Sequence, residues 1–267
     1  MTTYGALVEY RELFGNLFRR DLQAKYRGSA LGVLWTVANP VLLMGVYYLV
    51  FGVVWKSAPL KSGNNYPLYL LSGLALWTFF AAAFQSSTRS MLDNANLIRK
   101  TRFPRQLVPL SVVGAHLVSF GVMLAGLLVV NAIVLPQARA TELLAIPLAA
   151  LFVCFVSGLS LAAASLNVLF RDIEFVVASA LVPWFFLTPI IYSLSNVPGA
   201  TAHAHVVAAI HWANPLSPAV EAIRAPLFRG ELPFWGDALY LVVAAAAALA
   251  LGAFVFRRVD DVIAVEV

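Results

Sequence analysis

The chain has 267 residues, of which 61% are hydrophobic and 12% are charged, and its mean hydropathy is +0.83. A soluble protein of this composition would have too little polar surface to face water, and no segment is long and polar enough for a nucleotide-binding fold. The net charge of +5 reflects Lys and Arg residues gathered between apolar runs rather than a surface for nucleic acid. We therefore predict an all-α polytopic membrane protein with no nucleic-acid partner.

The N-terminal segment, residues 1–30, is predicted to form an amphipathic helix at the cytoplasmic membrane interface. Apolar side chains recur at three- and four-residue spacing over residues 7–27, and most basic residues lie on the opposite face. Gly28 then breaks the pattern. Because basic side chains on such a helix reach lipid phosphates, four residues are predicted to bind headgroups: Arg19, Arg20, Lys25 and Arg27.

Six apolar runs follow, each about 20 residues or longer, which is the length of a membrane-spanning helix. Residues 31–256 are therefore predicted to form one six-span transmembrane domain, with runs at 31–55, 66–88, 107–135, 143–170, 175–194 and 238–256. The 195–236 segment has five prolines between short apolar pieces, which predicts an outer gate loop with short re-entrant helices. Residues 257–267 are assigned to a tail.

The distribution of basic residues predicts the orientation of these spans. Thirteen of the 18 Lys and Arg residues fall on one side of the membrane and five on the other. Loops rich in Lys and Arg stay in the cytoplasm. Both termini, the 93–105 segment and the 257–267 tail are therefore predicted to be cytoplasmic.

The acidic residues lie in loops and at span ends rather than within the spans. Ion-coupled transporters usually carry a proton or sodium ion on an intramembrane carboxylate. The chain also lacks the P-loop motif that binds ATP. Energy for any transport is therefore expected to come from a partner protein.

The 93–105 segment is the candidate contact for that partner. Asp93, Asn94 and Asn96 are possible helix caps, and they precede apolar and basic side chains in a short helix. Six residues are predicted to dock into the partner: Leu97, Ile98, Arg99, Lys100, Arg102 and Phe103. The alternative is a basic loop that contacts anionic lipid.

The histidines and the aromatic residues each have two interpretations. His116 lies in the third run and is interpreted as a hydrogen-bonding group between helices. Aromatic residues near the span ends fit an interfacial belt, although Trp184 and Phe185 follow Pro183 and would offer a stacking surface for sugar rings. Three outer histidines lack an accompanying carboxylate or thiolate, so no metal site is predicted. They are His203, His205 and His211.

Five motifs occur in the same order as in the permeases of bacterial polysaccharide-export ABC transporters, which include the O-antigen and teichoic acid exporters. The chain resembles this family over nearly its whole length. The motifs are the arm from Tyr10 to Trp35 with Asn39-Pro40, Leu97-Ile-Arg-Lys-Thr-Arg-Phe-Pro104, Asn167-Val-Leu-Phe-Arg-Asp-Ile173, Pro189-Ile-Ile-Tyr192 and Asn214-Pro-Leu-Ser-Pro218.

The resemblance implies a homodimeric permease of the ABC type 2 class in the bacterial cytoplasmic membrane. It would pair with two copies of a separate ABC ATPase, which binds ATP and Mg²⁺, while this chain binds no cofactor. The N-terminal helix and the 93–105 coupling helix would contact the ATPase, and the outer helices would gate a channel for a lipid-linked glycan. The first and fifth spans would line that channel with Asn39, Tyr47, Trp184, Phe185 and Tyr192.

Two alternatives stay open from the sequence. One is an ABC-type exporter of drugs or small lipids. The other is a membrane-embedded enzyme that acts on lipid-linked sugars, with Asp172 or Glu174 as its base. These two carboxylates more simply cap a tight turn between the fourth and fifth spans.

Overall fold

The computed structural model describes residues 9–29, 32–54, 65–101, 103–194 and 204–266. These residues form helices and connecting turns, with no β-strand in the described ranges. The longer helices are α2 (Arg11–Tyr26), α3 (Trp35–Tyr47), α4 (Tyr66–Asp93), α5 (Ala95–Lys100), α6 (Leu107–Val134), α7 (Ala145–Leu169), α8 (Ile173–Leu187), α9 (Ala204–Ala213), α10 (Leu216–Arg224) and α11 (Trp235–Glu266). The described residues also include three short 3₁₀ turns, η1 (Gly32–Leu34), η3 (Pro136–Ala138) and η4 (Glu142–Leu144). Two π-helical segments are η2 (Tyr48–Val54) and η6 (Ala225–Arg229).

Five helical stretches in the described residues are long and apolar enough to cross a membrane, which confirms an all-α membrane protein. They are Trp35–Val54, Tyr66–Asp93, Leu107–Val134, Glu142–Leu169 and Trp235–Asp260. The predicted fifth span differs, because α8 has only 15 residues. At 1.5 Å per residue it is about 22 Å long, which is shorter than the ~30 Å hydrocarbon core of a bilayer.

The early end of α8 follows from its sequence. Thr188 precedes Pro189, and the ring of a proline disfavours the helical conformation of the residue before it. Thr188 is accordingly extended, with φ −92° and ψ 135°. Pro183 lies inside α8 without ending it, and Pro40 is similarly accommodated within α3.

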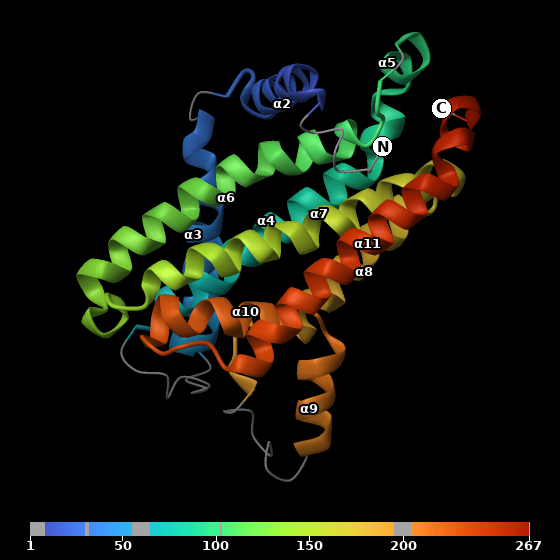
Figure 1. The fold of residues 1–267 in the computed structure, drawn as a ribbon. Coiled ribbons are helices and arrows are strands. Elements are labelled where there is room, and N and C mark those ends of the chain that lie inside the picture. Colours follow the sequence, from blue (N-terminus) through green and yellow to red (C-terminus); the bar gives the residue numbers. More distant parts are fainter. Residues whose placement is uncertain (1–8, 30–31, 55–64, 102, 195–203, 267) are drawn as a thin grey trace.

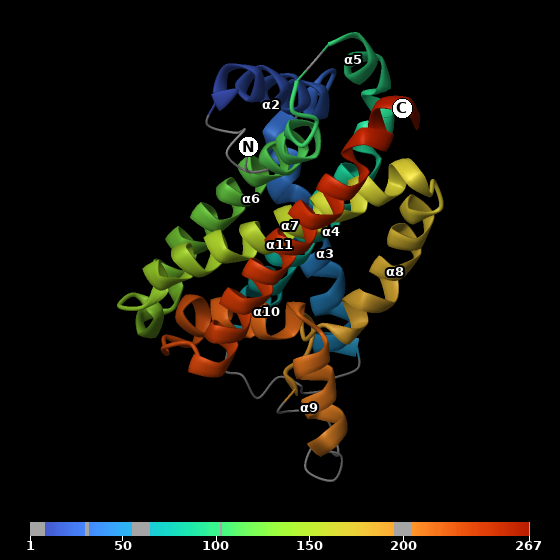
Figure 2. The same cartoon turned by 45° about the vertical axis from the view of Figure 1, so that its right-hand side comes forward.

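The long helices pack as a bundle around α4, which contacts α3, α6, α7, α8 and α10. One end of the bundle, called here the α2 end, carries α2, α5 and the last turns of α11, as Figures 1 and 2 show. The opposite end, called the α9 end, carries α9 and α10. α11 continues as helix to Glu266, so the predicted 257–267 tail is largely the end of this last helix.

α7 and α11 approach each other most closely through glycines. A Cβ atom added to Gly158 would overlap the backbone of Ala248, and one added to Gly252 would overlap the carbonyl of Gly158. Small residues at such crossings allow two membrane helices to pack backbone against backbone.

Candidate functional site

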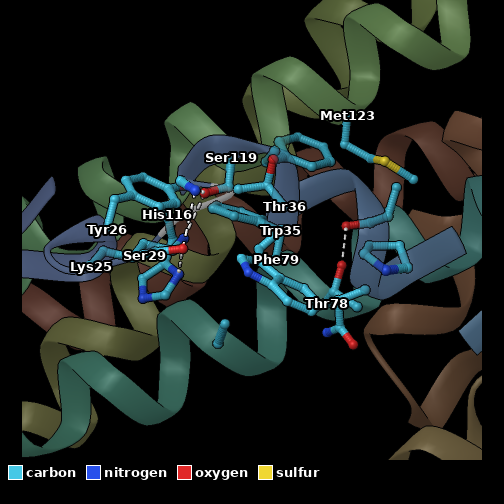
Figure 3. A pocket seen from close by; sticks show the side chains of 16 residues that line it. Lys25, Tyr26, Ser29, Trp35, Thr36, Thr78, Phe79, His116, Ser119 and Met123 are labelled. Atoms are coloured by element: carbon cyan, nitrogen blue, oxygen red, sulfur yellow. Dashed lines mark hydrogen bonds between the residues drawn. The ribbon is translucent and has the colours of Figure 1, made fainter. Parts of the chain in front are cut away.

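A cavity with one polar wall, called here the polar cavity, lies at the α2 end, between α2, α3, α4 and α6. Its volume is about 410 Å³. Figure 3 shows side chains from all four helices around it. The polar lining residues include Lys25, Ser29, Asn39, Thr78 and His116.

The centre of the cavity's polar wall is a contact between α2 and α6. Lys25 Nζ lies 2.6 Å from Ser119 Oγ and 3.2 Å from His116 Nδ1. The Tyr26 hydroxyl lies 2.8 Å from the same Ser119 oxygen. His116 therefore joins α6 to α2, and its Nδ1 accepts from the ammonium when the imidazole is neutral with its proton on Nε2.

The local sequence explains how Lys25 reaches this wall. Gly28 has φ +78° and Gly32 has φ +46°, a region that glycine occupies without steric cost. The helix thus ends at Tyr26 and the chain begins its turn into α3 at once. Although Lys25 is an exposed residue, desolvation of its ammonium at this wall lowers its pKa from 10.5 to about 8.

The cavity has the chemistry of an anion site, since a cation and two hydroxyl groups converge on one wall. A phosphate oxygen accepts hydrogen bonds from all such groups. The rest of the lining is largely apolar and includes Ala75, Phe79, Phe120 and Met123. The site thus combines a place for a phosphate with an apolar surface beside it.

The four predicted headgroup residues do not act as one set. Only Lys25 lines the cavity, whereas Arg19 and Arg27 are exposed. Arg20 forms an ion pair of 2.7 Å with Asp21, whose other oxygen accepts from Ser111 Oγ of α6 at 2.7 Å. The apolar face of α2 packs on protein, because Leu17 forms a cluster with Leu107 and Val108.

The predicted coupling residues divide between the core and the surface. Ile98 is only 6% exposed and packs with Met91 and Phe256, so the expectation that it offers apolar bulk to a partner is wrong. Leu97 and Phe103 are half-buried against the Leu17 cluster. The exposed members are Arg99 and Lys100, and Arg102 lies outside the described residues.

The predicted channel-lining residues lie in three places within one copy of the chain. Asn39 lines the polar cavity. Trp184 lines an apolar cavity of about 710 Å³ between α8 and α9, and its Nε1 donates to Asn214 Oδ1 over 2.8 Å. Phe185 is 8% exposed and stacks on Tyr47 with ring centroids 5.6 Å apart, and Tyr192 packs against the same cluster.

Sequence reasoning missed two features of this site and its surroundings. The first is Ser119, whose spacing of three residues from His116 puts both on one face of α6. The second is Arg224, one of the five basic residues that the sequence places on the outer side of the membrane, which is completely buried in the structure. The apolar residues on both sides of Arg224 were the available signal for its burial.

The histidines of the α9 end form no metal site in the described part of the chain. His211 Nε2 lies 2.7 Å from Asp237 Oδ1 at the start of α11. His205 lines the apolar cavity, and His203 lies outside the described residues. In the first turn of α8, the Glu174 amide donates to Asn167 Oδ1 over 3.0 Å.

These observations define a multi-pass helical membrane protein with a polar cavity at one end and short helices at the other. Comparison with known families gives the class, since residues 12–228 match the ABC-2 type transporter family. The chain belongs to this family.

Individual relatives support the same assignment. The chain is 34% identical over 246 residues to the O-antigen export system permease protein RfbA of Myxococcus xanthus, covering 92% of this chain and 90% of the relative. Two Klebsiella pneumoniae proteins of the same name are 36% and 35% identical, each over 67% of this chain and 68% of their own length.

Proposed function

We propose that the chain is the membrane-spanning permease subunit of an ATP-driven exporter, and that its cargo is a lipid-linked polysaccharide of the O-antigen kind. The observation that carries this proposal is the similarity to three O-antigen export permeases over at least two thirds of the chain. The polar cavity supports it, because a lipid-linked glycan presents a phosphate beside an apolar chain, and the cavity offers Lys25 beside an apolar surface.

The cavity is the proposed entry point for the cargo's phosphate group. Lys25 provides the charge, and Ser119 and Tyr26 provide hydroxyl groups. The α2 end is taken as cytoplasmic, since basic residues gather there. Both termini then lie in the cytoplasm and the protein resides in the bacterial inner membrane.

A cytoplasmic ABC ATPase is the proposed source of energy, with two copies working on two permease copies. The exposed cations Arg99 and Lys100 of α5 are the proposed contact points. ATP and Mg²⁺ bind to that partner. Closure of the ATPase dimer pushes α5, and the bundle transmits the displacement to the α9 end.

A second copy of the chain is proposed to lie beside α3 and α8. Only 6% of the most apolar window of the first span is buried within one copy. Large apolar side chains, such as Val46 at 58% exposure, project from it. A disulfide between copies is expected for Val46→Cys in a Cys154→Ala background, and Ile133→Cys on α6 is the matched control.

The test of the proposed function is export by the purified permease with its ATPase in vesicles that contain lipid-linked polysaccharide. ATP-dependent movement of the polymer is expected, and movement of drug-like amphiphiles with no polymer export would contradict the proposal. Charge reversal by Arg99→Glu with Lys100→Glu is expected to abolish export and leave insertion intact. Arg139→Glu, an exposed arginine at the α9 end, is the control that should export normally.

A further inference from the structure

The segment that follows α8 leaves four consecutive carbonyl groups outside any helix. Non-helical backbone at membrane depth is stable only where protein groups satisfy it. Each of these carbonyls accepts a hydrogen bond from a side chain of another element. Arg224 donates to Pro189 at 2.8 Å and to Ile190 at 3.3 Å, Tyr66 donates to Ile191 at 2.9 Å, and Tyr69 donates to Tyr192 at 2.9 Å.

Arg224 is the centre of this arrangement. Its side chain is 0% exposed, and it is among the largest fully buried side chains of the described residues. Its guanidinium also donates to the Tyr69 hydroxyl at 2.8 Å and to Ser72 Oγ at 3.3 Å, both on α4. The Tyr69 ring lies beneath it, with the guanidinium carbon 3.8 Å from the ring centroid.

The charge of Arg224 is balanced within its own helix. Glu221 Oε1 lies 3.2 Å from Arg224 Nη1, and Glu221 Oε2 lies 2.7 Å from Arg229 of η6. A buried charge is retained when it is both paired and hydrogen-bonded, and loss of one partner leaves the other uncompensated. The contact of Arg224 with α4 and with the 189–192 carbonyls, called here the Arg224 joint, therefore depends on the guanidinium and its several N–H donors.

Gly73 of α4 makes room for this joint. A Cβ atom at Gly73 would overlap Arg224 Nη2 and lie 3.1 Å from Ile190 Cγ2. The guanidinium is thus enclosed by α4 on one side and by the 189–192 carbonyls on another. α4, α10 and the end of α8 therefore meet at this side chain.

α9 is held much more loosely. None of the ten described residues of α9 is buried. The polar contacts between α9 and α11 are the His211–Asp237 pair and the Tyr240 hydroxyl, which donates to the Trp212 carbonyl at 3.0 Å. The two outer helices therefore differ, because most of α10 is buried in the bundle, whereas α9 is attached, among the described residues, through contacts of its last residues with α10 and α11.

We propose that Arg224 is a positioning residue of the export pathway, which makes α10 and the end of α8 move as one body. Opening at the α9 end then occurs by displacement of α9 over a fixed α10. This inference rests on the proposed export function, but its structural part is independent of cargo and ATPase. The physical reason for this common movement is the set of 189–192 carbonyls. The end of α8 cannot shift away from α10 without exposing the Pro189 and Ile190 carbonyls, which accept hydrogen bonds from Arg224.

The structural part is tested on the purified permease without its partner. Ala222 of α10 is 0% exposed, so Ala222→Cys in a Cys154→Ala background places a buried thiol on the fixed helix. Arg224→Met is expected to raise the rate of labelling by a polar maleimide about tenfold, because the joint opens more often. Arg139→Met should leave the rate unchanged. Unchanged labelling in Arg224→Met would overturn the inference.

Two further variants separate the guanidinium fork from charge and from misfolding. Arg224→Lys keeps the charge but has only three donors for the five acceptors that the guanidinium contacts, so labelling should also rise. Wild-type labelling in the lysine variant would overturn the role of the fork. Gly73→Ala keeps every charge and should raise labelling by displacing Arg224, while Gly121→Ala, with open space around it, should not. Adding Gly73→Ala to Arg224→Met should give little further effect.

The transport part is tested with the ATPase present. Arg224→Met is expected to lower the polymer exported per ATP hydrolysed about tenfold while hydrolysis continues. A merely structural role would lower export and hydrolysis in proportion, which would contradict the positioning role. If the wild-type complex exports no polymer, the proposed function fails, yet the labelling results still decide whether Arg224 joins α8 to α10.

Discussion

Arg105 donates from Nη1 to the Asp260 carboxylate over 3.0 Å, although 155 positions separate the two residues in the chain. The same nitrogen donates to the backbone carbonyl of Asp260. Arg105 lies in the connection between α5 and α6, and Asp260 lies in the last turns of α11. The proposed coupling segment is thus tied directly to the last helix of the bundle.

Loss of the Arg105–Asp260 contact is expected to weaken the coupling between ATP hydrolysis and export, with little effect on the stability of the fold. The pair is partly exposed, with side-chain exposures of 24% and 46%. Its contribution to stability is therefore at most about 1 kcal/mol. Arg105→Ala should lower ATP-driven export more than Asp260→Asn, because the asparagine variant keeps the bond to the backbone carbonyl. Equal export by Arg105→Ala and the wild type would show that the tie has no role in coupling.

Ile98 is expected to stabilise the position of α5 rather than to contact a partner. Ile98→Ala removes a side chain that is packed with Met91 and Phe256, and such a change costs about 2–4 kcal/mol. A lower melting temperature of the purified permease should follow. Asn96→Ala on the exposed face of α5 is the control, and its melting temperature should match the wild type.

The crossing of α7 and α11 is expected to reject any larger residue at Gly158. Gly158→Val would drive a side chain into the Ala248 backbone, and overpacking of this kind costs about 1–3 kcal/mol or more. Reduced yield and a lower melting temperature are expected in detergent. Gly126→Val on α6 has open space around it and should be tolerated; equal losses for both would refute the close contact.

Binding of a phosphate-bearing lipid is expected to depend on pH through Lys25. Its pKa of about 8 lies below the ordinary 10.5, so the ammonium loses its proton as the pH rises through 8. A bound anion favours the charged form and raises this pKa, so binding takes up a proton above pH 8. The affinity for a polyprenyl diphosphate should therefore fall as the pH rises from about 7 to about 9.5.

The control for that pH dependence is Lys25→Arg, whose guanidinium stays charged throughout the range. Its affinity should vary little with pH. Equilibrium binding in detergent at both pH values provides the measurement. An equally steep fall in the arginine variant would assign the dependence to another group.

Much of the architecture was predictable from local patterns. The periodicity before Gly28, the apolar runs and the proline-rich outer segment each correspond to helices at closely similar positions. The length of α8 was overestimated, because hydropathy counts Ile190 and Ile191 as span residues although Pro189 has already ended the helix. Composition does not register this conformational effect of proline.

The site was less predictable, since its contacts join residues far apart in sequence. From the sequence, Lys25 is expected at lipid headgroups and Arg224 in an outer loop, because charged side chains usually lie outside the hydrocarbon of a membrane. Their partners His116 and Tyr69 lie 91 and 155 positions away. Only the folded bundle shows that these cations face polar groups of other helices. Ile98 was placed on the surface for the complementary reason, because its neighbours Arg99 and Lys100 are charged.

α11 has a polar side-chain contact near each of its ends, Asp237 with His211 and Asp260 with Arg105. Its 32 residues form one continuous helix, about 48 Å long. It therefore forms one rigid connection between the α2 end and the α9 end of the bundle. Under the proposed coupling, a displacement at Arg105 would reach α9 through α11 without any change of backbone conformation in between.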